Sequence, residues 1–392
     1  MLYNRCGKLK IKLARFLIFI FLMMIIIALG FNSYLRQSDI KFEALTFSKV
    51  WDMFFGQREP LERTRLVSEL QFPSGSNTRF NVYRHYIVEA SKLGLRFYDK
   101  RFKEEESFPF AMNRPSIKIN DPYIVVGDTN GKQIRVFRGG QEVWSRLLDE
   151  NILSFDISRS GYLSVVHERQ KYRSGLTVFN PEGEVSFSMG TVEDFLLVPS
   201  IQSTLDRVVI NRLNVSNVGI NSILQFVDFT GKVDYSISLH DAFTTKIDYL
   251  NDGSIVVFGD NSVRIFDRDG DKQWVRNYPV IFSATILEGR FLSLATSFKD
   301  DYDENTFNKT RVEILAGQDL RGSIELGGRV NVMDSSGSVV SLATARSVYV
   351  IDNKARLIGQ FESEQDIIDI KMIDEKTLVV VGRTRASLVE ID

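Results

Sequence analysis

The sequence predicts an all-β protein, an eight-bladed β-propeller that follows an N-terminal transmembrane helix. Three observations predict this fold. Short alternating strands recur at regular spacing from about residue 65 to the end. Most of these units carry a tight turn, usually with glycine, between two strands. A continuous apolar run lies near the start of the chain. We therefore expect a basic tail at 1–14, a transmembrane signal-anchor helix at 15–35, a linker at 36–64 and the propeller at 65–392.

The apolar run is Phe16–Leu29, and with the residues up to Leu35 it reaches about the ~20 residues that a membrane-spanning helix needs. Basic residues precede it without any acid among them: Arg5, Lys8, Lys10, Lys12 and Arg15. The positive-inside rule then places the N-terminus in the cytoplasm. We expect a single-pass protein of the inner, cytoplasmic membrane with its propeller in the periplasm or outside the cell.

Two other interpretations of this run stay open. Cleavage near Gly30 would turn it into a signal peptide and release the propeller, since Ala28-Leu29-Gly30 is a small-x-small site. A buried core helix is the third, but it gives the basic flank no role. The only cysteine, Cys6, precedes the run, so the exported part contains no disulfide. This cysteine-free exported region favours a bacterial source.

The linker at 36–64 contains an expected amphipathic helix, Phe42–Gly56. Its apolar residues at i, i+3, i+4, i+7 and i+8 share one face: Phe47, Val50, Trp51, Phe54 and Phe55. Three roles for this face stay open. It packs on the propeller, lies in the membrane interface, where Trp and Phe are favoured, or docks another protein.

The propeller is predicted from internal repetition. A strand, a tight turn and a second strand with an aromatic or aliphatic residue at a fixed offset recur. The pairs are Ile134–Phe137 with Gly139–Trp144, Leu176–Phe179 with Gly183–Phe187, Leu224–Asp228 with Gly231–Tyr235, Val263–Asp267 with Gly270–Trp274, and Val348–Asp352 with Ala355–Ile358.

A strongly apolar strand, buried on both faces, precedes each of these hairpins. Another strand comes before it, at Ile117, Leu153, Phe195, Ile247, Phe282, Val330 and Ile368. An earlier copy fits residues 79–110. The eight copies begin near residues 79, 115, 152, 193, 246, 280, 329 and 366. This spacing suits four-stranded blades and predicts eight of them, with seven as the alternative.

The two ends of the repeat region predict how the ring closes. The last copy ends at Asp392 after three strands, and Leu66–Phe72 is a spare strand before the first copy. If Leu66–Phe72 completes the last blade, no sheet edge is left at the junction. Two longer insertions, Leu213–Ile220 and the acidic Lys299–Thr310, are expected to be solvent-facing loops.

The repeat resembles the quinoprotein-like and WD40-like β-propeller superfamily, known for PQQ-like repeats. Val263–Trp274 and Ile134–Trp144 carry the resemblance through a strand, a turn with glycine and a tryptophan. In the quinoprotein-like blades the tryptophan docks a neighbouring blade, which implies a structural role for Trp144 and Trp274. The repeat also resembles the non-enzymatic scaffold of the outer-membrane assembly machinery. Only two blades keep the tryptophan, and a fold does not determine a function.

Sequence motifs for chemistry are few. His85, His167 and His240 fall in different copies without metal-ligand spacing. A quinone-dependent dehydrogenase needs a pair of adjacent cysteines, which the exported region does not have. Asp267–Asp271 resembles the start of a calcium loop, but residue 278 is Tyr instead of a bidentate Glu, so we expect a hairpin turn. We expect no cofactor and no metal.

The charge and the motifs of the sequence limit the classes of partner that the protein is expected to bind. The formal net charge of −1 gives no basic footprint for nucleic acid. The leading hypothesis is a tethered scaffold that binds other envelope proteins and is not an enzyme. The alternative is a ligand-binding or enzymatic propeller for saccharides or peptides, with a site at the mouth of the central channel. Four aspartates that recur on first strands are its candidates: Asp156, Asp248, Asp334 and Asp369. The competing interpretation is that these residues cap turns. A sensor that signals through its short tail ranks last.

Overall fold

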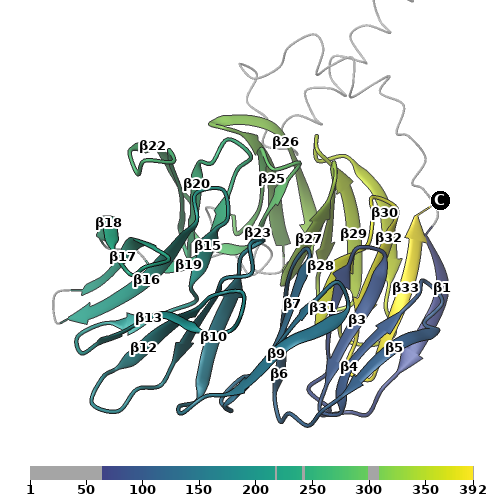
Figure 1. The fold of residues 1–392 in the computed structure, drawn as a ribbon. Helices are drawn as coiled ribbons and strands as arrows, with labels where there is room; N and C mark the ends of the chain where they lie inside the picture. Colours follow the sequence, from purple (N-terminus) through teal and green to yellow (C-terminus); the bar gives the residue numbers. More distant parts are fainter. Residues whose placement is uncertain (1–63, 217–218, 241–242, 299–308, 392) are drawn as a thin grey trace, which may run out of the picture. The chain divides into compact units, whose positions relative to one another are not determined.

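The computed structural model describes residues 64–216, 219–240, 243–298 and 309–391. Their strands form eight antiparallel sheets, arranged as the blades of a propeller (Figure 1). This confirms the eight-bladed prediction, and the seven-bladed alternative is wrong. In six blades the strands pair in chain order, whereas one blade has a divided first strand and the last blade takes the N-terminal strand Thr64–Gln71 as its outer strand. Most first strands contact the first strand of the next blade around the channel.

The first four blades comprise residues 79–240. Blade 1 contains β2 (Arg79–Tyr83), β3 (Tyr86–Ser91), β4 (Gly94–Tyr98) and β5 (Glu104–Pro109). Blade 2 contains β6 (Pro115–Asn120), β7 (Tyr123–Asp128), β8 (Gln133–Arg138) and β9 (Gln141–Leu147). Blade 3 contains β10 (Ile152–Ile157), β11 (Leu163–His167), β12 (Ser174–Phe179) and β13 (Val185–Thr191). Blade 4 contains β14 (Phe195–Leu196), β15 (Ser200–Gln202), β16 (Arg207–Ser216), β17 (Gly219–Asp228) and β18 (Val233–His240).

The last four blades complete the ring. Blade 5 contains β19 (Thr244–Tyr249), β20 (Ile255–Gly259), β21 (Ser262–Phe266) and β22 (Lys272–Asn277). Blade 6 contains β23 (Ile281–Leu287), β24 (Phe291–Thr296), β25 (Lys309–Ala316) and β26 (Asp319–Gly327). Blade 7 contains β27 (Val332–Ser336), β28 (Val339–Ala343), β29 (Ser347–Asp352) and β30 (Leu357–Glu362). Blade 8 contains β31 (Asp369–Met372), β32 (Thr377–Val381), β33 (Arg385–Ile391) and β1 (Thr64–Gln71).

The core lies between the blades, because each sheet is apolar on both faces. Alternate residues of a second strand face opposite neighbours: in β11, Val165 packs with blade 2 and Val166 packs with blade 4. Each of the eight interfaces between adjacent blades has a cluster of buried apolar side chains of this kind. The second strands are therefore almost wholly buried, as their continuous apolar sequence predicts.

Strand β1 closes the ring, as the spare N-terminal strand predicts. It pairs antiparallel with β33 from Thr64↔Ile391 to Gln71↔Arg385 (Figure 1). The Glu69 carboxylate accepts hydrogen bonds from Arg385 and from the Ser387 hydroxyl, both at 3.0 Å. Blade 8 thus combines strands from the N-terminal and C-terminal ends of the propeller. Backbone hydrogen bonds between β1 and β33 and an ion pair hold these two ends together.

Blade 4 departs from the prediction in two places. Leu213–Ile220 is expected to be a loop, but its described residues lengthen the β16–β17 hairpin, in which Val215 pairs with Ile220. The polar residues Asn214 and Asn221 face each other in this ladder, where both backbones find strand partners, so polarity alone did not imply a loop. The first strand, expected at Phe195, is divided into β14 and β15, which pair with separate parts of β16. Of the acidic insertion, 299–308 lie outside the described residues.

The blades have two distinct ends. We call the end that carries the turns between second and third strands, such as Arg169–Arg173, and the connections between blades, such as Phe72–Thr78, the connector face. The opposite end carries the turns between first and second strands and between third and fourth strands, and we call it the turn face. Thr64 pairs with Ile391, beside the 373–376 turn of blade 8, so β1 begins at the turn face.

The predicted transmembrane helix at 15–35 and the linker helix with Phe47, Val50, Trp51, Phe54 and Phe55 lie outside the described residues. Within the described ranges no helix is long and apolar enough to cross a bilayer.

Candidate functional site in the central channel

One register position of the first strands is polar in every blade. At this position each residue pairs with the second-strand residue that faces the next blade, as in Asp156↔Ser164 and Lys371↔Val379. The eight residues in blade order are Asn81, Lys118, Asp156, Ser200, Asp248, Thr285, Asp334 and Lys371. Asp156, Asp248 and Asp334 therefore occupy equivalent places, whereas Asp369 lies two residues before this position.

A cavity of about 970 Å³ lies against the first strands of blades 2 to 5. Its wall includes four members of the polar position, Lys118, Asp156, Ser200 and Asp248. The break between β14 and β15 contributes Val198 and Pro199, which are also part of the lining. Because cations and carboxylates both line it, the cavity suits a polar ligand better than an apolar one.

Asp156 joins blade 3 to blade 4. Its Oδ2 accepts a hydrogen bond of 2.9 Å from the backbone N–H of Ile201 in β15. Burial raises the pKa of the Asp156 carboxyl above its ordinary value, while the positive charge of Lys118 opposes the rise. Asp334 makes the same connection between blades 7 and 8, where its Oδ2 accepts from the Met372 N–H at 2.7 Å. Burial likewise raises the pKa of Asp334. Both side chains fasten neighbouring first strands, which are sheet edges.

Asp248 and Asp369 have local partners instead. Lys246 Nζ lies 3.0 Å from Asp248, and Lys371 Nζ lies 3.0 Å from Asp369, in each case within one strand. Each carboxylate also accepts the backbone N–H of the residue that follows it. Asp369 lines a second cavity of about 150 Å³ between blades 8 and 1. The four aspartates therefore do not converge on one cavity: Asp156 and Asp248 share one, and Asp369 lies at another.

Substitution of Asp156 separates its structural role from its charge. We expect Asp156→Ala to lower the free energy of unfolding by about 1–3 kcal/mol, because the Ile201 N–H loses its acceptor. Asp156→Asn keeps an acceptor oxygen and should retain most of the stability. Chemical unfolding at neutral pH compares the two, and equal losses in both variants would contradict a hydrogen-bonding role.

The same variants have a pH signature. The folded-state pKa of Asp156 is raised, so the folded protein binds more protons than the unfolded chain between the unfolded pKa, about 3.9, and the raised folded value. Stability from this group is therefore present at low pH and is lost as pH rises through that window. Relative to Asp156→Asn, the wild-type protein should lose stability across this range.

Trp144 docks the next blade. Its indole Nε1 donates to the Pro181 carbonyl of blade 3 at 3.1 Å, and its ring centroid lies 5.8 Å from that of Phe179. Trp274 packs against the apolar cluster between blades 5 and 6. Phe187 and Tyr235 occupy the corresponding places in blades 3 and 4, each against the turn glycine of the following blade. Aromatic residues other than tryptophan thus maintain the same contact.

The turns of these hairpins explain the recurring Asp or Asn before them. The Asp267 carboxylate accepts from the backbone N–H groups of Asp269 and Asp271 at 3.0 and 2.8 Å. These hydrogen bonds lower the pKa of Asp267, and the bond from Asp271 has the larger effect. Asp267–Asp271 is therefore a hairpin turn, as the sequence predicts. In the part of the chain that the structure describes, no group of three His, Cys, Asp or Glu side chains could hold a metal ion.

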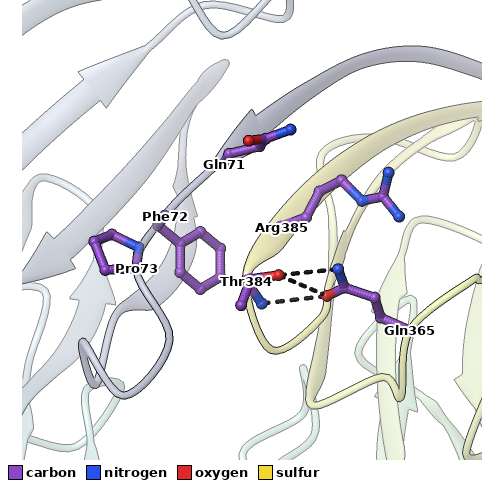
Figure 2. Close-up of a pocket in the computed structure, with 6 residues that line it drawn as sticks. All are labelled: Gln71, Phe72, Pro73, Gln365, Thr384 and Arg385. Atoms are coloured by element: carbon purple, nitrogen blue, oxygen red, sulfur yellow. Dashed lines mark hydrogen bonds between the residues drawn. The ribbon is translucent and has the colours of Figure 1, made fainter.

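The sequence did not predict a cavity of about 410 Å³ that lies where the end of β1 meets blade 8. Figure 2 shows its lining, which comes from the end of β1 and from blade 8: Gln71, Phe72, Pro73, Gln365, Thr384 and Arg385. The Gln365 amide bonds to the Thr384 hydroxyl at 2.9 Å and accepts from the Thr384 N–H at 3.2 Å. These bonds hold the 382–384 turn against the connection that precedes β31, and the Phe72 N–H donates to the Thr384 carbonyl at 2.9 Å, which joins the turn to the end of β1. The spare strand at Leu66–Phe72 was the available signal, since closure brings the two ends together.

Comparison with solved structures shows the same fold. BamB from Moraxella catarrhalis is 13% identical, with a TM-score of 0.57 over 83% of this chain and 97% of that one. The C-terminal WD40 domain of Sif2 is 15% identical, with a TM-score of 0.64 over 85% of this chain and all of that domain. The resemblance to the quinoprotein-like and WD40-like propeller superfamily is thereby confirmed at the level of fold.

Comparison with curated proteins finds no match. A family model does match, over residues 57–391, which include the whole described propeller and the residues just before β1. The chain therefore belongs to DUF5711, described as a family of unknown function.

Proposed function

We propose that this protein is a membrane-anchored, extracytoplasmic β-propeller that acts as a protein–protein interaction scaffold in the cell envelope. The apolar run at 15–35 with its basic flank supports a single-pass anchor in the cytoplasmic membrane, with the N-terminus in the cytoplasm. The propeller then lies in the periplasm or outside the cell. Cleavage near Gly30 is the alternative, which makes the same propeller a secreted protein.

The observation that carries the scaffold proposal is the connector face of blades 3 and 4. The lengthened β16–β17 hairpin brings Val215 and Ile220 to this face, where they are 50% and 43% exposed. Phe195 and Tyr172, both 42% exposed, and Val192, 63% exposed, belong to the same end of the blades. Exposed apolar and aromatic side chains gathered on one surface are typical of protein-binding sites.

The place where β1 begins supports the same proposal. Thr64 lies at the turn face of blade 8, so the chain enters the propeller at the end of the strands opposite the connector face. The linker face of Phe47, Val50, Trp51, Phe54 and Phe55 is a further contact for the membrane or a partner in this proposal.

In-cell crosslinking followed by affinity purification tests the scaffold. We expect the full-length protein in its membrane to capture a reproducible set of envelope proteins. A shortened chain of residues 61–392 should capture fewer of them, because it has lost its membrane location while keeping all described strands. Failure of both proteins to capture any specific partner would contradict the scaffold.

A ligand-binding or enzymatic propeller is the second candidate function. The cavity of about 970 Å³ favours it, because Asp156 and Asp248 come from different blades to one polar lining. The inter-blade bond of Asp156 and the ion pair of Asp248 weigh against a free catalytic carboxylate. The scaffold therefore remains the better-supported function.

A further inference from the structure

A compact group of arginine and aromatic side chains lies on the connector face between blades 3 and 4. We call it the Arg–aromatic patch, and it consists of Arg169, Lys171, Tyr172, Arg173 and Phe195. The Arg169 guanidinium lies 4.9 Å from the Tyr172 ring centroid, and that of Arg173 lies 4.8 Å from the Phe195 ring centroid. Both arginines thus lie over aromatic rings, within the range of cation–π attraction.

Backbone pairing makes these residues one surface. The Arg173 N–H donates to the Thr191 carbonyl at 2.9 Å, which joins the β11–β12 turn to the end of β13. The Tyr172 ring lies against Gly190, where an added methyl group would lie 2.8 Å from it. Phe195 pairs with Leu213 at the base of the lengthened β16–β17 hairpin. The patch therefore continues onto the hairpin that exposes Val215 and Ile220.

The charge of the patch is not neutralised within the described chain. Lys171 and Arg173 are exposed, and none of the three cations forms an ion pair with a described carboxylate. The nearby acids compensate only in part. Asp194 is buried and is bound by Arg212 and Asn214, and Glu168 accepts from Asn151 at 2.8 Å. Glu168 and Glu193 are exposed carboxylates, and the three cations of the patch exceed these two acids.

We propose that the Arg–aromatic patch binds an acidic, extended segment of a partner protein. Guanidinium groups that lie over aromatic rings present N–H groups at their edges to carboxylates, and the arrangement is ordered before binding. Arg169 also donates to the Ser188 hydroxyl at 3.4 Å, which helps to hold it in place. Arginine with tyrosine and phenylalanine is also the composition in which binding energy concentrates at protein interfaces. This inference rests on the proposed scaffold function and names the chemistry of its partner.

A membrane surface fits this patch less well than a protein segment. Recognition of anionic lipids relies on clusters of about four to eight Lys or Arg residues, more than the three here. Two of these three cations are committed to stacking geometries that favour directional bonds over a diffuse charge interaction. Lipid binding is accordingly one of the outcomes that the test must exclude.

Binding of a defined acidic peptide tests the chemistry. The probe is a fluorescent peptide with the sequence Lys-Asp-Asp-Tyr-Asp-Glu-Asn-Thr, which matches residues 299–306 of this chain. We expect the full-length protein in nanodiscs of neutral lipid to bind it, and to bind it less tightly as salt rises. The triple variant Arg169→Glu, Lys171→Glu and Arg173→Glu should bind about tenfold more weakly or worse.

A matched control changes the net charge equally at the turn face: Arg101→Glu, Lys232→Glu and Lys376→Glu, all exposed residues. It should bind the probe within about twofold of the wild-type protein. Equal weakening in both triple variants would overturn the patch as the site, and so would full binding of a probe whose acids are replaced by amides. Binding of the wild-type protein to anionic vesicles, lost only in the patch variant, would replace the protein segment with a lipid surface.

Photocrosslinking in cells identifies the natural occupant. Tyr172 of the full-length protein is replaced by p-benzoylphenylalanine, and the crosslinked peptide is mapped by mass spectrometry. We expect an acidic segment of another protein, lost when Arg169 and Arg173 are changed to Glu. An adduct with residues 299–308 of the same chain, with lipid or with nothing would overturn the proposal. Leu93, 71% exposed at the connector face of blade 1, is the reference position. Partners captured there but not at Tyr172 would contradict the patch and leave the scaffold standing.

Discussion

Removal of β1 is expected to prevent the propeller from folding into a closed monomer. A chain that begins at residue 73 keeps every other strand but leaves β33 as an open edge beside blade 7. It also loses the Glu69–Arg385 ion pair and the packing of Leu70 and Phe72 against the cluster between blades 8 and 1. We expect a loss of about 5 kcal/mol or more, which is comparable with the whole stability of many domains. The visible result should be aggregation through the exposed edge.

Size-exclusion chromatography and thermal unfolding measure this effect. The control begins at residue 61, which removes the predicted anchor and most of the linker while leaving β1 complete. Addition of a synthetic peptide of residues 61–73 to the truncated chain should restore part of the stability, because the peptide supplies the missing strand. A truncated chain that stays monomeric and unfolds at the control temperature would show that the ring does not need this strand.

Gly183→Ala is expected to destabilise the protein by about 2–4 kcal/mol. Gly183 has φ = +83°, which disfavours any residue with a side chain by about 1–2 kcal/mol. Its added methyl group would also lie 2.8 Å from the Trp144 ring, which is held in place by the bond to Pro181. Chemical unfolding should show the full effect.

Two comparisons separate the contributions of backbone and packing. Gly139 has φ = +60° with open space around it, so Gly139→Ala should cost only the backbone part, about 1–2 kcal/mol. In a Trp144→Ala background, Gly183→Ala should cost no more than Gly139→Ala, because the ring that it strikes is gone. Equal costs for Gly183→Ala in both backgrounds would mean that the Trp144 contact does not explain the glycine.

Repetition in the sequence was sufficient to predict the blades. Apolar second strands such as Leu378–Gly382 can be buried only between two neighbouring sheets, and the recurring turn glycine defines each outer hairpin. The spare strand before the first copy predicted the closing pair of β1 and β33, which the structure confirms. The blade starts were found within a few residues, since these patterns are local and repeat eight times.

The candidate site was predictable only in part. Recurrence identified Asp156, Asp248 and Asp334, which do share one register position, but it could not distinguish Asp369 two residues earlier. What each carboxylate binds depends on the neighbouring blade, as with the Ile201 and Met372 N–H groups. The Arg–aromatic patch was not found from the sequence, because its members come from a turn in blade 3 and from a short strand in blade 4.

By itself the sequence determined that the chain folds into repeated four-stranded blades and that its own N-terminal strand closes the ring. The blades follow from alternation of apolar residues and from turn chemistry, which act between residues close in the chain. The closing pair follows from the strand count, since the last copy has three strands and one strand precedes the first copy. Only the tertiary structure decided which polar groups meet across blade interfaces and that Leu213–Ser216 and Gly219–Ile220 extend a hairpin. Such contacts join residues about 40 or more positions apart, as in Asp156 and Ile201, and their geometry depends on how one sheet is rotated against the next.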